Sequence, residues 1–215
     1  MTGRIPVPTG VHPDLTAPLD GATHGRLVFR GGTPDLDLSA GRSSAHLLEA
    51  SFAGGRPRIR SDAGVVVVTY PSGLRAWLRY ALRPAVARFA LNGSVPWTFE
   101  FHGGVDSISA DLRELVVSSI DLRSGIGGGT LWLPRPTGTL RLAIAGGVSG
   151  LVIHRPMAIP MRTVIRGGVS SLTIDDEALG PLGGGWRRES TGWHGAPDRL
   201  DIAIASGVSN LVIAE

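Results

Sequence analysis

Histidine and acidic side chains are the residues of this chain that could hold a metal ion. The six histidines, at positions 12, 24, 46, 102, 154 and 194, are never two or four residues apart, and the 215-residue chain contains no cysteine. Zinc sites need such closely spaced ligands. The run Asp175-Asp176-Glu177 lacks the alternating ligands of a calcium loop and is typical of a solvated turn. The sequence therefore predicts no metal site and no cofactor.

Glycine-rich segments are the next candidates, for phosphate binding or nucleophilic catalysis. Residues 125–130 and 183–186 contain several glycines, but neither segment is followed by the lysine of a phosphate-binding loop. The segment Gly147-Val148-Ser149-Gly150 is one residue shorter than the Gly-x-Ser-x-Gly signature of serine hydrolases. We interpret all three segments as turns.

Two pairs of aspartates could supply the carboxylates that hydrolyse a glycosidic bond. They are Asp35 with Asp37 and Asp106 with Asp111, and each pair requires a fold that brings both side chains together. Aspartates at alternate positions are more simply the solvent face of a strand. A carbohydrate-active β-helix enzyme therefore remains a third hypothesis. Our main expectation is that the chain is not an enzyme and has no catalytic residues.

Arginines are concentrated in residues 74–91. A candidate interaction patch there consists of Arg75, Arg79, Arg83, Arg88 and Trp77. Three of these arginines would share one face of a helix, but Pro84 interrupts it, so either a short helix or two edge strands is expected. The patch would suit an acidic partner or anionic lipid. In the alternative, the arginines merely lie along an edge with their charges in water.

The overall charge does not indicate a nucleic-acid partner. The isoelectric point is about 10.4, yet the net charge is only +3, and all 21 basic residues are arginine. Few groups in the chain lose a proton between neutral pH and the pH at which arginine titrates. A small excess of positive charge therefore raises the isoelectric point strongly. No apolar run approaches the ~18 residues of a membrane span, and no signal peptide is recognisable, which predicts a cytoplasmic protein.

One pattern recurs along the chain and predicts the elements that position these residues. Apolar residues lie three positions before, and four and six positions after, the second residue of a Gly-Gly or Ser-Gly turn; these second glycines are Gly32, Gly104, Gly147, Gly168 and Gly207. With a looser copy at Gly125, the spacings are 21, 22 and 21 residues, and then 39 across an insertion at residues 180–195. We therefore expect an all-β, solenoid-like or β-helix-like stack of strand, glycine turn and strand repeats. Its apolar ladders should contain Ile144, Leu151, Ile165, Leu172, Ile204 and Leu211.

The pattern also suggests domain limits. Residues 1–21 are expected to be a flexible proline-rich leader, residues 22–96 an N-terminal β region, and residues 97–215 the repeats, with one continuous domain over 22–215 as the alternative. The last repeat is expected to form an open end of the stack. Trp186 and Trp193, in the insertion, are predicted to cap that end; otherwise the end pairs with a second molecule.

The repeats resemble the toast-rack family, which comprises the C-terminal domains of LiaF-like cell-wall-stress response proteins and related "putative adhesin" domains of bacteria. The matching segments are residues 111–115, 131–138, 146–149, 167–170 and 206–211, and residues 25–70 are similar to the N-terminal half of that family. The resemblance implies a β-solenoid-like domain that acts through protein contacts in envelope-stress regulators and has no catalytic residues. The chain departs from the membrane-bound members in having no membrane span.

Three hypotheses for function follow. The first is a non-enzymatic interaction or scaffold module of toast-rack type. The second is a self-assembling, bactofilin-like structural protein that associates through its ends. The third is the β-helix enzyme.

Overall fold

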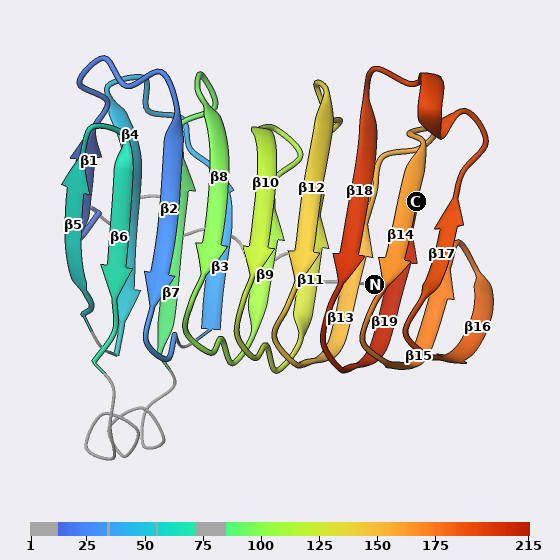
Figure 1. The fold of residues 1–215 in the computed structure, drawn as a ribbon. Coiled ribbons are helices and arrows are strands. Elements are labelled where there is room, and N and C mark those ends of the chain that lie inside the picture. Colours follow the sequence, from blue (N-terminus) through green and yellow to red (C-terminus); the bar gives the residue numbers. More distant parts are fainter. Residues whose placement is uncertain (1–12, 34, 55, 72–84) are drawn as a thin grey trace, which may run out of the picture.

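The computed structural model describes residues 13–33, 35–54, 56–71 and 85–215. These residues form nineteen strands and one short 3-10 turn, and the strands make two mixed sheets that lie face to face (Figure 1). The predicted all-β class is confirmed. Both sheets of the described part are open, with an edge strand at each end, so they do not close into a barrel.

Each sheet has parallel strands in its centre and antiparallel strands at its ends. In spatial order, the ten-stranded sheet contains β1 (Leu15–Pro18), β4 (His46–Ala53), β7 (Val86–Leu91), β3 (Asp35–Ala40), β9 (Ile108–Asp111), β11 (Gly129–Trp132), β13 (Val148–His154), β19 (Val208–Ala214), β15 (Val169–Ile174) and β16 (Glu177–Leu182). The nine-stranded sheet contains β17 (Trp186–Glu189), β14 (Met161–Ile165), β18 (Arg199–Ile204), β12 (Thr139–Ile144), β10 (Val116–Leu122), β8 (Pro96–Phe101), β2 (Gly25–Arg30), β6 (Val65–Thr69) and β5 (Arg58–Asp62).

The predicted glycine turns connect the two sheets. The strand before each turn lies in the nine-stranded sheet, and the strand after it lies in the ten-stranded sheet; the connected pairs are β2–β3, β8–β9, β10–β11, β12–β13, β14–β15 and β18–β19. The turns stack so closely that a Cβ atom at Gly103 would lie only 1.7 Å from the carbonyl oxygen of Gly31. Glycine is therefore required at this position by the approach of the neighbouring backbone.

Apolar side chains fill the space between the sheets. All six residues predicted for the ladders are at most 1% exposed, which confirms the prediction. Ile204 lies between Ile144 and Ile165 in one sheet, and in the other sheet Leu211 lies between Leu151 and Leu172. The alternation of apolar and polar residues in the sequence therefore gives the correct inward face.

The final strand pair is not at the end of the stack. Strand β18 lies between β12 and β14, and β19 lies between β13 and β15 (Figure 1). The prediction that the last repeat forms an open end is wrong. Strand β16, which runs into the insertion, and β17 within it lie at that end of the two sheets, and the chain then returns to place β18 and β19 two positions inward of them.

Near the opposite end, the proline-rich leader contains a strand. Residues 15–18 form β1, which pairs antiparallel with β4 and buries Ala17 at 1% exposure. Four residues with one buried side chain carry no alternation signal, which explains why the sequence predicted no strand there. Both sheets continue across residues 96 and 97, since β2 pairs with β8 and β3 pairs with β9.

In the described ranges, the structure contains no helix with the length and apolar composition needed to cross a membrane.

Candidate ligand-binding site

Most of the predicted arginine patch lies outside the described residues. Arg75, Trp77, Arg79 and Arg83 all belong to the segment 72–84 that the structure does not describe. Arg88 is on β7, where its exposed guanidinium has Nε 3.8 Å from the carboxylate of Asp37 on β3. This pair is too exposed and too long to hold the two strands together strongly.

The two tryptophans of the insertion contact opposite faces of the nine-stranded sheet. Trp186 is half-buried on β17, directly across from Ile165 on β14. Trp193 lies in the 3-10 turn η1 (Trp193–Gly195) and is 5% exposed, with the guanidinium carbons of Arg162 and Arg199 at 4.9 and 5.1 Å from its ring centroid. Trp186 thus packs against the core beside β14, whereas Trp193 contacts outward-facing arginines of β14 and β18.

Of the aspartates considered for catalysis, Asp35 and Asp37 lie on β3, Asp111 lies on the neighbouring β9, and Asp106 lies in the turn before β9. Asp37 on β3 and Asp111 on β9 both face outward from the ten-stranded sheet. Burial raises the pKa of Asp37, the charge of Arg88 lowers it, and the charge of Asp111 adds to the increase. Asp111 is itself bound to Arg113 in a bidentate pair, at 2.6 and 2.8 Å. The described residues include no cluster of three His, Cys, Asp or Glu side chains that could hold a metal ion.

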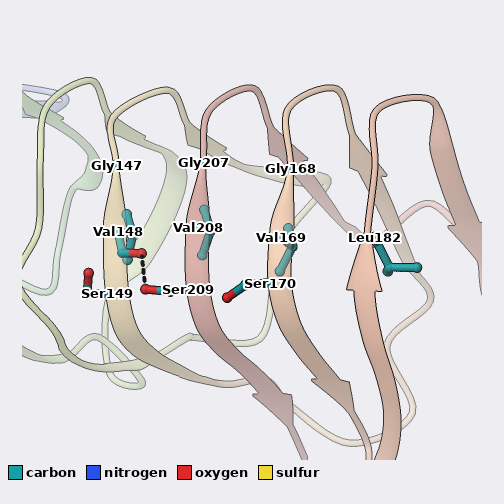
Figure 2. A pocket seen from close by; sticks show the side chains of 10 residues that line it. All are labelled: Gly147, Val148, Ser149, Gly168, Val169, Ser170, Leu182, Gly207, Val208 and Ser209. Carbon is teal, nitrogen blue, oxygen red and sulfur yellow. Dashed lines mark hydrogen bonds between the residues drawn. The ribbon is translucent and has the colours of Figure 1, made fainter.

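A shallow depression crosses the turn ends of β13, β19 and β15. It has a volume of about 530 Å³ and is lined by Gly147, Val148, Ser149, Gly168, Val169, Ser170, Leu182, Gly207, Val208 and Ser209. Figure 2 shows one Gly-Val-Ser segment on each of the three strands, with Leu182 of β16 at one side. The valines are buried, and Ser209 makes a long hydrogen bond, 3.5 Å, to the carbonyl oxygen of Val148. Because no charged or aromatic side chain lines it, this surface offers little chemistry.

A second depression, of about 400 Å³, lies where β9, β11, β13 and β19 end. We call it the Trp132 groove; its lining residues are Arg113, Trp132, Leu133, Arg135, His154, Arg155, Pro156 and Glu215. Parallel strands bring these residues together, because their C-terminal ends lie at one edge of the sheet. Trp132 and His154 are directly opposed on β11 and β13, and their rings are stacked with centroids 5.6 Å apart and planes inclined by 11°.

Arg155 anchors one side of the Trp132 groove. Its side chain is only 8% exposed, and its guanidinium lies 2.5 Å from Asp175 and 2.7 Å from Glu215. It also donates a hydrogen bond to the carbonyl oxygen of Ile159, whereas the buried Nε has no partner among the described residues. These contacts tie the ends of β13, β15 and β19 together, and charge-assisted pairs of low exposure hold such groups in place.

The groove was not identified from the sequence. In the sequence, residues 131–138 are distinctive only as part of the family resemblance, and His154 has no other histidine at a metal-binding spacing. The alternation along β11 and β13 predicts that Trp132 and His154 face outward. Their contact depends on which strands are neighbours, and spacing alone does not indicate this.

Comparison with known protein families and with curated proteins finds no match to this chain. Among solved structures, it is similar to the crystal structure of a "putative cell adhesion protein" from Clostridium sporogenes. The two chains are 18% identical, with a TM-score of 0.75, and the match covers 93% of this chain and 96% of the other. At this identity the likeness shows the fold: two face-to-face β-sheets extending over nearly the whole of both chains.

Proposed function

We propose that this chain is a non-enzymatic protein-interaction or scaffold module of toast-rack type. The observation that carries the proposal is the parallel, in-register pairing of strands on both sides of the glycine turns, as at Ile144, Ile204 and Ile165. Such a stack is a rigid, solenoid-like support with two broad outer faces, a form that commonly presents binding surfaces. The full-length likeness to a protein named for cell adhesion fits an interaction role.

The outer face of the nine-stranded sheet supports the proposal through its charges. One row across four neighbouring strands contains Arg141, Asp201, Arg162 and Glu189, so that positive and negative residues alternate. Asp201 forms a bidentate pair with Arg162 at 2.5 and 2.8 Å, whereas Arg141 is exposed and has no ion pair with a described residue. A fixed row of this kind favours a partner of complementary charge and sets its register.

The edge strands disfavour the alternative of end-to-end assembly. Strand β17 carries Arg187, Arg188 and Glu189, and β16 contains Pro181. Charged residues and proline on an edge hinder the addition of another strand. We therefore favour contact with a different protein over self-assembly. From the family resemblance, we further propose that this contact takes place in a bacterial cytoplasm and in response to stress on the cell envelope.

Crosslinking in the source bacterium tests the proposed function. The tagged chain should capture one discrete protein, more strongly when cell-wall synthesis is inhibited, and the purified pair should form a saturable complex that weakens as salt is raised. Arg141→Glu should reduce capture about tenfold, since it reverses the unpaired charge of the row. Arg42→Glu, the reversal of another exposed arginine that has no ion pair with a described residue, located just after β3 of the ten-stranded sheet, is the matched control and should leave capture unchanged. Self-association alone, or a saturable partner captured equally by both variants, would contradict the proposal as stated.

A further inference from the structure

We propose that the Trp132 groove binds a saccharide that carries a carboxylate, with a hexuronic acid unit as its simplest form. This inference goes beyond the protein-interaction role, because it assigns a small-molecule site to the opposite sheet.

The parts of the aromatic rings that their stacking leaves open suit contact with the apolar C–H groups of a sugar. Trp132 and His154 are both half-buried and stacked, so each ring is held in one orientation by the other. Leu133 and Pro156 extend the apolar lining on either side. Pockets that bind small molecules combine such a surface with a few fixed polar groups, and a volume of about 400 Å³ is within their usual range.

The charges indicate one anionic group on the ligand. Of the three arginines that line the groove, Arg113 is paired with Asp111, and Arg155 is paired with Asp175 and Glu215. Arg135 is exposed and forms no ion pair or hydrogen bond with any residue that the structure describes. A carboxylate is the natural partner for this free guanidinium, because the two planar groups can form a pair of charge-assisted hydrogen bonds.

The remaining polar atoms favour a hydroxylated ligand over an acidic peptide. Within the described structure, the indole N–H of Trp132 and the ring nitrogens of His154 make no hydrogen bond. Glu215, which also lines the groove, pairs with Arg155 through Oε1, and its Oε2 makes no hydrogen bond with a described residue. A sugar hydroxyl can donate to that carboxylate. A peptide rich in carboxylates would instead be repelled by it, since like charges at close range disfavour binding.

The groove is also preorganised. Arg155 is nine-tenths buried and joins Asp175 to Glu215, so these two lining residues, Arg155 and Glu215, are held in place before a ligand arrives. When a ligand binds to a site supported in this way, less free energy is lost to ordering the side chains of the site.

Calorimetric titration of the full chain tests the assignment, with methyl galacturonoside, which carries a single carboxylate, as the probe and the neutral methyl galactoside as its match. The chain should bind the acidic sugar at least about tenfold more tightly, because the pair with Arg135 is available only to the carboxylate. Arg135→Gln should remove that preference while leaving the weaker neutral binding unchanged. Trp132→Ala should weaken both sugars about tenfold. Arg123→Gln, on the other sheet, is the control for a lost surface arginine and should have no effect.

Three results would overturn the proposal. The first is equal affinity for the acidic and neutral sugars, including the absence of binding by both up to about 10 mM. The second is an acidic-sugar affinity that survives both Arg135→Gln and Trp132→Ala, with circular dichroism showing an intact fold. The third is tighter binding of a glutamate hexapeptide that competes for Arg135, which would make the groove a peptide site. None of these results affects capture of a protein partner through Arg141, so the two proposals fail separately.

Discussion

At the scale of single residues, the two positions of each glycine turn have different roles. The first position touches the next turn in the stack: a Cβ atom at Gly146 would lie 2.2 Å from the backbone of Ser124. The second position is open, and a Cβ atom at Gly147 would have no heavy atom closer than 3.9 Å. Where serine takes the first position, its hydroxyl bonds the neighbouring turn, as Ser206 does at 2.5 Å to the carbonyl oxygen of Gly146. Close stacking therefore constrains only the first position.

This difference predicts unequal effects of two adjacent substitutions. Gly146→Ala should destabilise the protein by about 3 kcal/mol or more, because the new methyl group must displace a neighbouring backbone. Gly147→Ala should change the free energy of unfolding by less than about 1 kcal/mol, since the space is open and the φ angle is not positive. Chemical denaturation of both variants measures the difference. Equal effects would show that the turns are not stacked as described.

The sequence predicted the buried residues well and the groove poorly, for a physical reason. Burial depends on local alternation, so Ile165 and Leu172 could be placed inward from the residues on either side of them. The contacts of outward-facing residues depend on which strand lies beside them. Trp132 and His154 are 22 positions apart, and only the pairing of β11 with β13 makes them neighbours.

At the scale of elements, the insertion provides the outer strands of both sheets at one end. Strand β16 continues the ten-stranded sheet beyond β15, and β17 continues the nine-stranded sheet beyond β14. The 3-10 turn η1 then places the Trp193 ring in contact with the guanidinium groups of Arg162 and Arg199. Cation–π contacts of this kind contribute up to about 2 kcal/mol each when shielded from water. The insertion thus has packing that a mobile loop would lack.

Removing both tryptophans should loosen this end. We predict that Trp186→Ser with Trp193→Ser detaches β17 and exposes the unpaired edge of β14, so that oligomers form as concentration rises. Light scattering measures the mass over a range of concentrations. Val116→Ser, which changes an exposed apolar residue, is the control, and its mass should not change with concentration.

Retention of the wild-type mass by the double tryptophan variant, with the fold intact by circular dichroism, would show that these side chains do not protect the end.

At the scale of the whole molecule, the spatial order of the strands departs from their order in the sequence. The repeating pattern predicts strands and their inward faces, but it does not specify which strand pair is next to which. Ile204 fits equally well against Ile144 and Ile165, because all three are the same residue at the same position. The order is instead decided by the insertion, which takes the chain past the end of the stack before it returns.

The final strand pair, β18 and β19, also helps to build the Trp132 groove. Since β19 lies directly beside β13, Glu215 reaches Arg155, and the same arginine reaches Asp175 at the end of β15. A stack in sequence order would put β15 next to β13 and move Glu215 away. The site and the order of the strands therefore depend on each other.

Disulfide trapping tests this order most directly, and the absence of cysteine from the natural chain makes the result unambiguous. Ala143 on β12 is paired with Ala203 on β18, whereas Val164 on β14 lies one strand farther away; all three are half-buried on the outer face. Adjacent strands are about 4.8 Å apart, within the reach of a disulfide, and twice that distance is not. Mass spectrometry after mild oxidation should find a disulfide in Ala143→Cys with Ala203→Cys and none in Ala143→Cys with Val164→Cys. A disulfide in the second pair, with the first pair left reduced, would contradict the account.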